Sequence, residues 1–251
     1  MRRLVLIVLG FVLIVVPTAC RLDADVLIDV DADGAGTVTV SARLDREAAS
    51  KLGDPKAAIK VDDMRAAGWK VSDPVSDKET GEVTLSAVRS FASPSELSTV
   101  LTEIGGSSVF SGTKLQIADG FASTDYDFRT QIDLTGSVDQ FSDPALKEAL
   151  GGLALGRTPE QLKAEGMSSG DSATLSVTLD LPGKKLTSNG ESANGRASWK
   201  FPLNSGNATS QELIANASDS QRSVLILIGA GAALLVVAVV LAGVAIKRAR
   251  S

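Results

Sequence analysis

Alternating apolar and polar residues dominate the middle of the chain and predict β-strands. The clearest run is 125–134, where every second side chain from Tyr126 to Leu134 is apolar or Thr and those between are polar. A period of two indicates an antiparallel sheet with one face in water. Further strands are predicted near 25–30, 37–44, 81–87, 114–118, 173–181 and 197–203. The turn Asp33-Gly34-Ala35-Gly36 joins the first two into a hairpin.

Helical spacing is rarer and is confined to a few punctuated segments. Ser93-Pro94-Ser95-Glu96 offers an N-cap, a first-turn proline and a capping acid, and Gly105-Gly106 ends the apolar stripe that follows. A second helix is predicted from Asp54-Pro55 to Gly68. Together with the strands, these segments predict an α+β fold, in which an antiparallel sheet carries helices packed on one face.

The two ends of the chain are apolar in different ways. Leu4 to Val16 is a run of 13 residues that follows two arginines, and all of them are apolar except one glycine. A helix of this length would reach only about 20 Å, which is typical of a secretory signal peptide. Val224 to Ile246 has 23 uncharged residues, about 34 Å of helix, which matches a hydrocarbon core of about 30 Å. This pattern predicts one C-terminal transmembrane helix and a cell-membrane location, single-pass, with the main domain on the extracytoplasmic side.

The sequence therefore divides into five parts. They are a lipoprotein-type signal peptide (1–19), an exported domain (20–204), a polar tether rich in Ser, Asn and Ala (205–222), a transmembrane helix (223–246) and a basic cytoplasmic tail (247–251).

The single cysteine lies where the signal-like segment ends. Cys20 follows the small residues Thr18 and Ala19, which is typical of a bacterial lipobox whose cysteine is acylated. Pro17 departs from that pattern, because an aliphatic residue is usual there. The alternative is a cysteine that happens to end an ordinary signal peptide. The sequence predicts lipidation at Cys20, and it excludes an intramolecular disulfide.

Charge and composition narrow the function. Five of the 25 basic residues lie in the end segments and none of the 30 acidic ones does, so 21–222 carries a net charge of −10, which argues against nucleic acid as a partner. Histidine is absent, and no nucleophile elbow or phosphate-binding loop occurs. Asp29-x-Asp31-x-Asp33-Gly34 copies the first half of a calcium loop, but its twelfth position is Val40. We therefore expect that the protein is not an enzyme and that it binds neither a metal ion nor a cofactor.

The last third of the exported region carries a pattern of turns and strands. The strand to Leu181 leads into Pro182-Gly183-Lys184, then Ser188-Asn189-Gly190, Gly195 and Ala197-Ser198-Trp199-Lys200-Phe201-Pro202-Leu203. With the lipobox-like start and the hairpin from Ala24, this resembles the LppM family of actinobacterial lipoproteins. The resemblance implies a cell-envelope protein with an exported α/β domain. It also implies lipid binding, since the mycobacterial member is linked to phosphatidylinositol mannosides.

Two functions remain open at this point. The first is a non-catalytic lipoprotein whose exported domain binds a lipid or lipoglycan of its own membrane or envelope, with acyl chains in a gap between sheet and helices. The candidate lipid-binding residues are Trp69, Phe91, Phe128, Lys184, Lys185 and Trp199. Each aromatic has ordinary core packing as its alternative. The second function is a surface protein-interaction or sensing module without a lipid ligand. An apolar cavity would favour the first and a packed core with an exposed patch the second.

Overall fold

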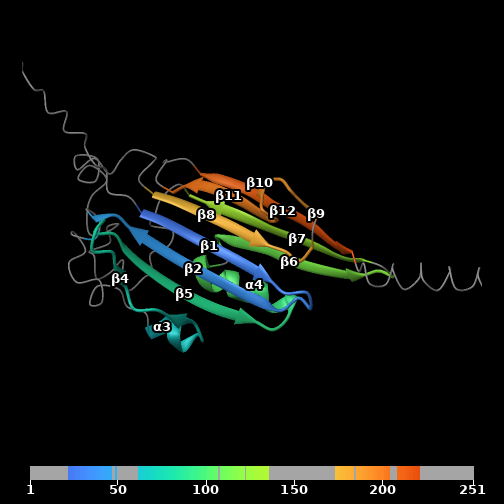
Figure 1. Ribbon diagram of the computed structural model, residues 1–251, viewed down its shortest axis with the longest axis horizontal. Helices are drawn as coiled ribbons and strands as arrows, with labels where there is room; N and C mark the ends of the chain where they lie inside the picture. The colour runs from blue at the N-terminus through green and yellow to red at the C-terminus, as the bar shows by residue number, and fades with distance from the viewer. Residues whose placement is uncertain are drawn as a thin grey trace, which may run out of the picture.

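The fold consists of two β-sheets that share one apolar core. The computed structural model describes residues 22–46, 49, 62–106, 108–121, 123–135, 173–183, 185–203 and 208–220. Within these residues the chain forms twelve strands and two helices, α3 (Asp62–Ala66) and α4 (Pro94–Gly105). The sheets face each other, and α4 lies beneath β5 beside the edge strand β6 (Figure 1).

The first sheet has eight strands in the order β10-β11-β8-β1-β2-β5-β3, and β4 also pairs with β5. Its strands are β1 (Leu22–Val30), β2 (Gly36–Leu44), β3 (Lys70–Val71), β4 (Val75–Ser76), β5 (Val83–Phe91), β8 (Ala173–Asp180), β10 (Glu191–Ala193) and β11 (Arg196–Pro202). All neighbours are antiparallel except β1 and β8, which run parallel. A parallel pair needs a long crossover, and here β2 to β7 lie between its two strands in the sequence.

The second sheet has four antiparallel strands in the order β6-β7-β12-β9. They are β6 (Phe110–Asp119), β7 (Ser123–Leu134), β9 (Lys185–Ser188) and β12 (Thr209–Ser220). Their inner face is fully buried at Phe128, Ile132 and Leu213. These side chains pack into the same core as Ile28 and Leu179 of the first sheet.

Several predicted elements are confirmed. β1 and β2 form the expected hairpin, and the alternate residues Tyr126 to Leu134 of β7 are all buried. The helix predicted from Ser93 begins at Pro94, ends at Gly105 and buries Leu97, Val100 and Leu101. Apolar periodicity was sufficient for these elements because each buries a single face.

The predicted fold class is wrong. Strands predominate, they form two sheets rather than one antiparallel sheet with helices on one face, and the two described helices have 5 and 12 residues. In the described part of the chain no helix is long and apolar enough to cross a membrane. This finding contradicts the predicted transmembrane helix and the predicted single-pass location. Residues 223–246 themselves lie outside the described residues.

The segment predicted as a polar tether, 205–222, also needs correction. Its residues Thr209–Ser220 form β12, which lies between β7 and β9 in the second sheet. Alternate residues Leu213, Ala215 and Ala217 are buried. Alanine gives a weak apolar signal in the sequence, but a small side chain fits a position that two sheets cover.

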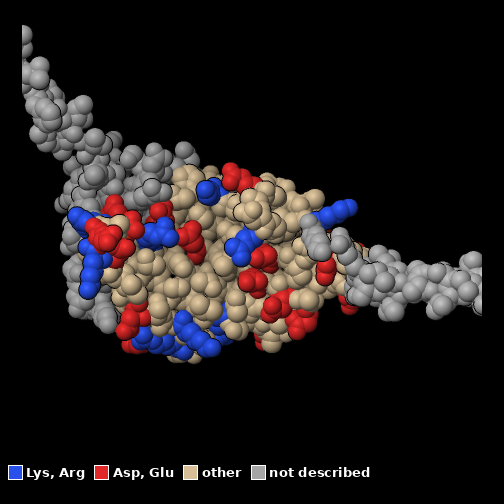
Figure 2. Space-filling view, viewed as in Figure 1, with Lys and Arg blue, Asp and Glu red and all other residues tan. Residues whose placement is uncertain are grey.

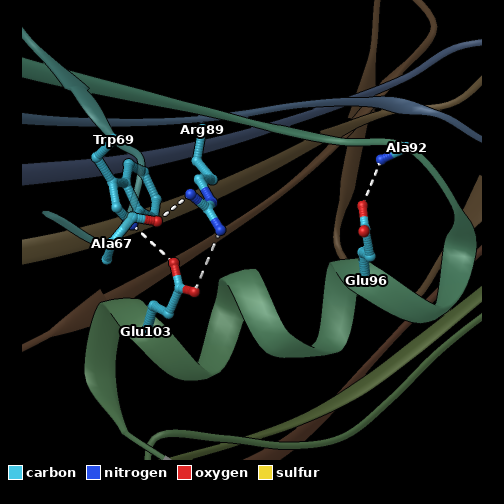
Figure 3. A network of polar contacts seen from close by, with 6 residues as sticks. All are labelled: Ala67, Trp69, Arg89, Ala92, Glu96 and Glu103. Atoms are coloured by element: carbon cyan, nitrogen blue, oxygen red, sulfur yellow. Dashed lines mark hydrogen bonds and ion pairs between the residues drawn. The ribbon is translucent and has the colours of Figure 1, made fainter. Parts of the chain in front are cut away.

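Polar contacts join α4 to the first sheet (Figure 3). The indole N–H of buried Trp69 donates to the Glu103 carboxylate at 2.8 Å, and Arg89 lies 3.6 Å from the other oxygen of Glu103. Arg89 also donates to the carbonyl of Ala67. At the other end of the helix Glu96 accepts the Ala92 N–H at 2.6 Å. Because buried polar groups are costly when unpaired, these contacts fix where α4 sits against β5.

Replacing Glu103 tests this attachment. We expect Glu103→Ala to lower the free energy of unfolding by about 2 kcal/mol, because it leaves the Trp69 indole N–H without its acceptor. Glu103→Gln keeps an acceptor oxygen and should lose clearly less. Urea unfolding followed by tryptophan fluorescence measures both, and equal losses in the two variants would contradict the role assigned to the indole hydrogen bond.

Candidate functional site

The candidate site is a hollow at the edge where the two sheets meet. β9 belongs to the second sheet and β10 to the first, so Asn189 and Gly190 between them carry the chain across. A hollow of about 360 Å³ lies beside this crossing. Its lining comes from the crossing, from β11 and from β12: Asn189, Gly190, Glu191, Ser198, Trp199, Lys200, Phe201 and Gln211.

Asn189 holds the crossing in place through its main chain and its side chain. Its N–H donates to the carbonyl of Ile214 at 3.1 Å, and its Oδ1 accepts the Ile214 N–H at 3.0 Å. Its Nδ2 donates to the carbonyl of Glu212 at 2.6 Å, and the same Oδ1 accepts the indole N–H of Trp199 at 2.9 Å. The side-chain amide thus continues the β9–β12 ladder and ties it to β11 of the other sheet.

Gly190 allows the crossing to pass close to β11. A Cβ at this position would lie 2.5 Å from the Ser198 carbonyl oxygen and 2.5 Å from Nε1 of Trp199. Both distances are far below van der Waals contact, and one partner is backbone. Any other residue here would displace β11 or turn Trp199, so glycine is required by close packing.

The residues around the hollow include one cation, one anion, neutral polar groups and two buried aromatic residues. Lys200 and Glu191 are exposed, while Gln211 is half-buried. Trp199 and Phe201 are buried, at 4% and 3% exposure. Such a set can donate and accept hydrogen bonds and can balance charge of either sign. Because Glu191 is the single carboxylate among the lining residues, the hollow lacks the carboxylate pair that glycoside cleavage uses.

The structure separates the residues that the sequence suggested for lipid binding. Trp69, Phe91 and Phe128 are buried in the common core, at 4%, 2% and 0% exposure, which is the alternative weighed for them. In the described residues they fill the space between sheets and α4 that was expected to take acyl chains. Trp199 lies at the hollow, whereas Lys185 is exposed on β9.

Other predicted positions lie outside the described residues, and some of the hollow's residues were missed. Lys184 and Cys20 are not among the described residues. Asn189 and Gly190 were noted only as part of a turn motif, and Gln211 fell in the supposed tether. The one sequence signal for the site was an Asn-Gly pair next to a Trp-containing strand, which does not by itself distinguish a crossing between sheets from a hairpin turn.

The calcium-like Asp motif belongs to the outer face of the first sheet and to its β1–β2 turn. Asp33 accepts the N–H of Ala35 at 3.1 Å and so stabilises the turn. Asp29 is the register partner of Asp180, whose carboxylate binds Arg196 at 2.7 Å. Burial, and then the charges of Asp180 and Asp31, raise the pKa of Asp29. No group of three or more acidic, His or Cys side chains in the described ranges is placed to hold a metal ion.

Acidic and basic side chains are scattered over the face seen in Figure 2, with uncharged surface between them. On this side the first sheet lies in front of α4 (Figure 1). Asp29, whose pKa is raised, is thus exposed on the first sheet and is not one of the residues that line the hollow.

Comparison with known proteins gives a distant likeness. No protein-family model and no curated protein matches the chain. Among solved structures, it is similar to the NMR structure of the folded domain of Mycobacterium tuberculosis LppM, with a TM-score of 0.40 and 16% identity over 82% of this chain and 95% of that one. The neighbour bears the family name that the sequence motifs suggested, and membership in that family stays a prediction.

Replacing Asn189 tests the crossing. We expect Asn189→Ala to lower the free energy of unfolding by about 2–3 kcal/mol, because it leaves the Trp199 indole N–H, the Ile214 N–H and the Glu212 carbonyl without their partner. Tryptophan emission should shift to longer wavelength as the indole meets water. Gln116→Ala, which removes a side-chain amide at an exposed position of β6, is the control. A variant as stable as the control would refute the assigned role.

Replacing Asp29 tests the acidic group. The proton binds more tightly to Asp29 in the folded protein because its pKa is raised, so its ionisation lowers stability as the pH rises above the ordinary value. We expect Asp29→Asn to raise the thermal midpoint at pH 7 and to lose this advantage at about pH 3, where the carboxyl is already protonated. Calorimetry at the two pH values measures this, and an equal gain at both would contradict it.

Proposed function

We propose that this protein is a non-catalytic binding module of a cell envelope, and that its corner hollow holds the polar head of a lipid or lipoglycan. The observation that carries the proposal is the lining of the hollow, which combines polar and charged residues with the buried Trp199 and Phe201. Ligand sites commonly combine such an aromatic surface with a few placed polar groups.

The size of the hollow and the packing of the core support a head group rather than an acyl chain. A volume of about 360 Å³ lies at the small end of ligand pockets. It has room for one ring-sized polar group. The aromatic side chains expected to line an acyl tunnel, such as Phe128, are instead packed into the core. The tails of a bound lipid would therefore stay in the bilayer.

The charges of the lining suit a head that carries both phosphate and hydroxyl groups. Lys200 supplies the single cation and can pair with phosphate. Gln211 and Ser198 offer hydrogen bonds to hydroxyls, and Glu191 accepts from them. Affinity from so few exposed groups is modest, so the protein needs its ligand at high local concentration.

A lipid on Cys20 would supply that concentration. The first strand begins at Leu22, two residues after the cysteine, so the folded domain would start directly at the anchor. Tethering converts binding to a lipid head in the same surface into an intramolecular event, which raises the effective concentration of the ligand. One acyl chain binds a membrane only weakly, whereas the diacylated cysteine of a lipoprotein holds firmly.

Native mass spectrometry of the full chain, extracted gently from its own membranes, tests this function. We expect a co-purifying lipid or lipoglycan, and we expect Lys200→Ala combined with Gln211→Ala to lose most of it, because both side chains line the hollow and neither is buried. Lys114→Ala, at an exposed position of β6, removes the same charge elsewhere and should keep the ligand. The same spectra report the mass of acyl chains on Cys20.

The outcomes separate the two functions. Ligand loss confined to the hollow variant supports the proposal. Bare protein after gentle extraction, or equal ligand retention in all variants, overturns it and favours the alternative, a surface module that binds other proteins without a lipid ligand. Circular dichroism of each variant, unchanged if the fold is intact, ties any loss to the hollow.

A further inference from the structure

Phe121 is the most exposed large apolar side chain in the described part of the molecule. It lies at the tip of the β6–β7 hairpin with 82% of its surface exposed. The turn is closed by a hydrogen bond of 2.7 Å from the Gly120 N–H to the Ser123 carbonyl. Among the described residues Val75 is the other exposed large hydrophobic, at 65%. Leaving a phenylalanine in water forgoes about 2 kcal/mol of burial.

The hairpin tip lies at the end of the domain opposite the start of β1 (Figure 1). β12 ends there too, because Ser220 pairs with Ser123 directly beside the tip. Four residues after Ser220 the sequence enters its uncharged run, which extends from 224 to 246. In the sequence, a long apolar stretch therefore begins four residues after the end of a strand that pairs beside this tip.

We propose that this end of the domain contacts a lipid surface and that the Phe121 ring enters its interfacial layer. Aromatic side chains prefer the boundary between head groups and acyl chains. A partner at this end has to cover an exposed ring and to suit a sequence that continues with 23 uncharged residues, and a lipid surface meets both requirements. A protein groove shaped for one ring would meet only the first.

The charges at this end determine which lipid surface it is. Asp119 and Asp219 flank the tip, and after burial their charges and that of Asp33 raise the pKa of Tyr126, whose hydroxyl donates to the Ala32 carbonyl. Lys185, the register partner of Ser218, is basic. The sequence also has Lys184 before it and Arg222 two residues after the end of β12. Acidic and basic residues are thus mixed here and give no net attraction to anionic head groups. The contact is therefore apolar, with zwitterionic lipid, and insensitive to salt.

Phe121→Trp in the full chain, mixed with phosphatidylcholine vesicles, tests the contact. The native Trp69 and Trp199 are buried and give a constant background. We expect the added emission to shift to shorter wavelength and to be quenched by phosphatidylcholine brominated near the top of its acyl chains. The matched control is Val75→Trp, because Val75 is an exposed apolar residue on β4 of the other sheet. Its emission should neither shift nor be quenched.

Each possible result either supports or overturns the proposed lipid contact. Quenching of Trp at 121 alone, unchanged by added salt and not increased by phosphatidylglycerol, supports the proposal. No quenching at 121, or equal quenching at 75, overturns it. A requirement for anionic lipid also overturns it, because the contact would then be electrostatic. The hollow is not involved, so Lys200→Ala with Gln211→Ala should leave this signal intact and distinguishes a failure here from a failure of the proposed function.

Discussion

The burial of two sheet faces against each other is the interaction on which the rest of the structure depends. Ile28 and Leu179 from one sheet and Phe128 and Leu213 from the other are fully buried in one cluster. The chain has only ten aromatic residues and one cysteine, so the core cannot rely on a disulfide and uses most of its large rings for packing. In the described part of the chain these side chains pack against one another, and the hollow lies at the edge of the sheets.

The crossing at Asn189 is the second constraint, and it follows from the first. A chain that leaves one sheet for the other must satisfy its backbone groups at the corner, where neither ladder continues. At this corner the side-chain amide of Asn189 donates to the Glu212 carbonyl and accepts the Ile214 N–H, as the backbone of a neighbouring strand would. Gly190 then passes too close to Ser198 and Trp199 for any side chain. Gly190 is also one of the residues that line the hollow.

Periodicity in the sequence predicted strands well and their arrangement poorly. Each of β1, β7, β8 and β11 buries alternate side chains, and that local property is visible in the residues. Which strands pair is decided by contacts between distant segments, so the parallel pairing of β1 with β8 had no local signal. The helix of α4 was predictable because its cap, stripe and stop are all local.

The candidate site was less predictable than the fold. Of its residues the sequence singled out Trp199, and it did so for apolar character rather than for the indole hydrogen bond that matters at the crossing. β12 was hidden because alanine and polar residues alternate along it, a pattern shared by flexible linkers. Its burial comes from neighbours on both sides, β7 and β9, which only the folded chain provides.

β12 also connects the two surfaces proposed to be functional. Gln211, near its beginning, lines the hollow, and Ser220, at its end, lies beside the hairpin that carries Phe121. Nine residues of strand separate them, about 30 Å. A head group held at Gln211 and a ring inserted at Phe121 can share one lipid surface only if this strand lies roughly parallel to it. β1 begins two residues after Cys20 in the sequence and starts at the end opposite the β6–β7 hairpin, so an acyl chain on that cysteine would favour the same lengthwise orientation.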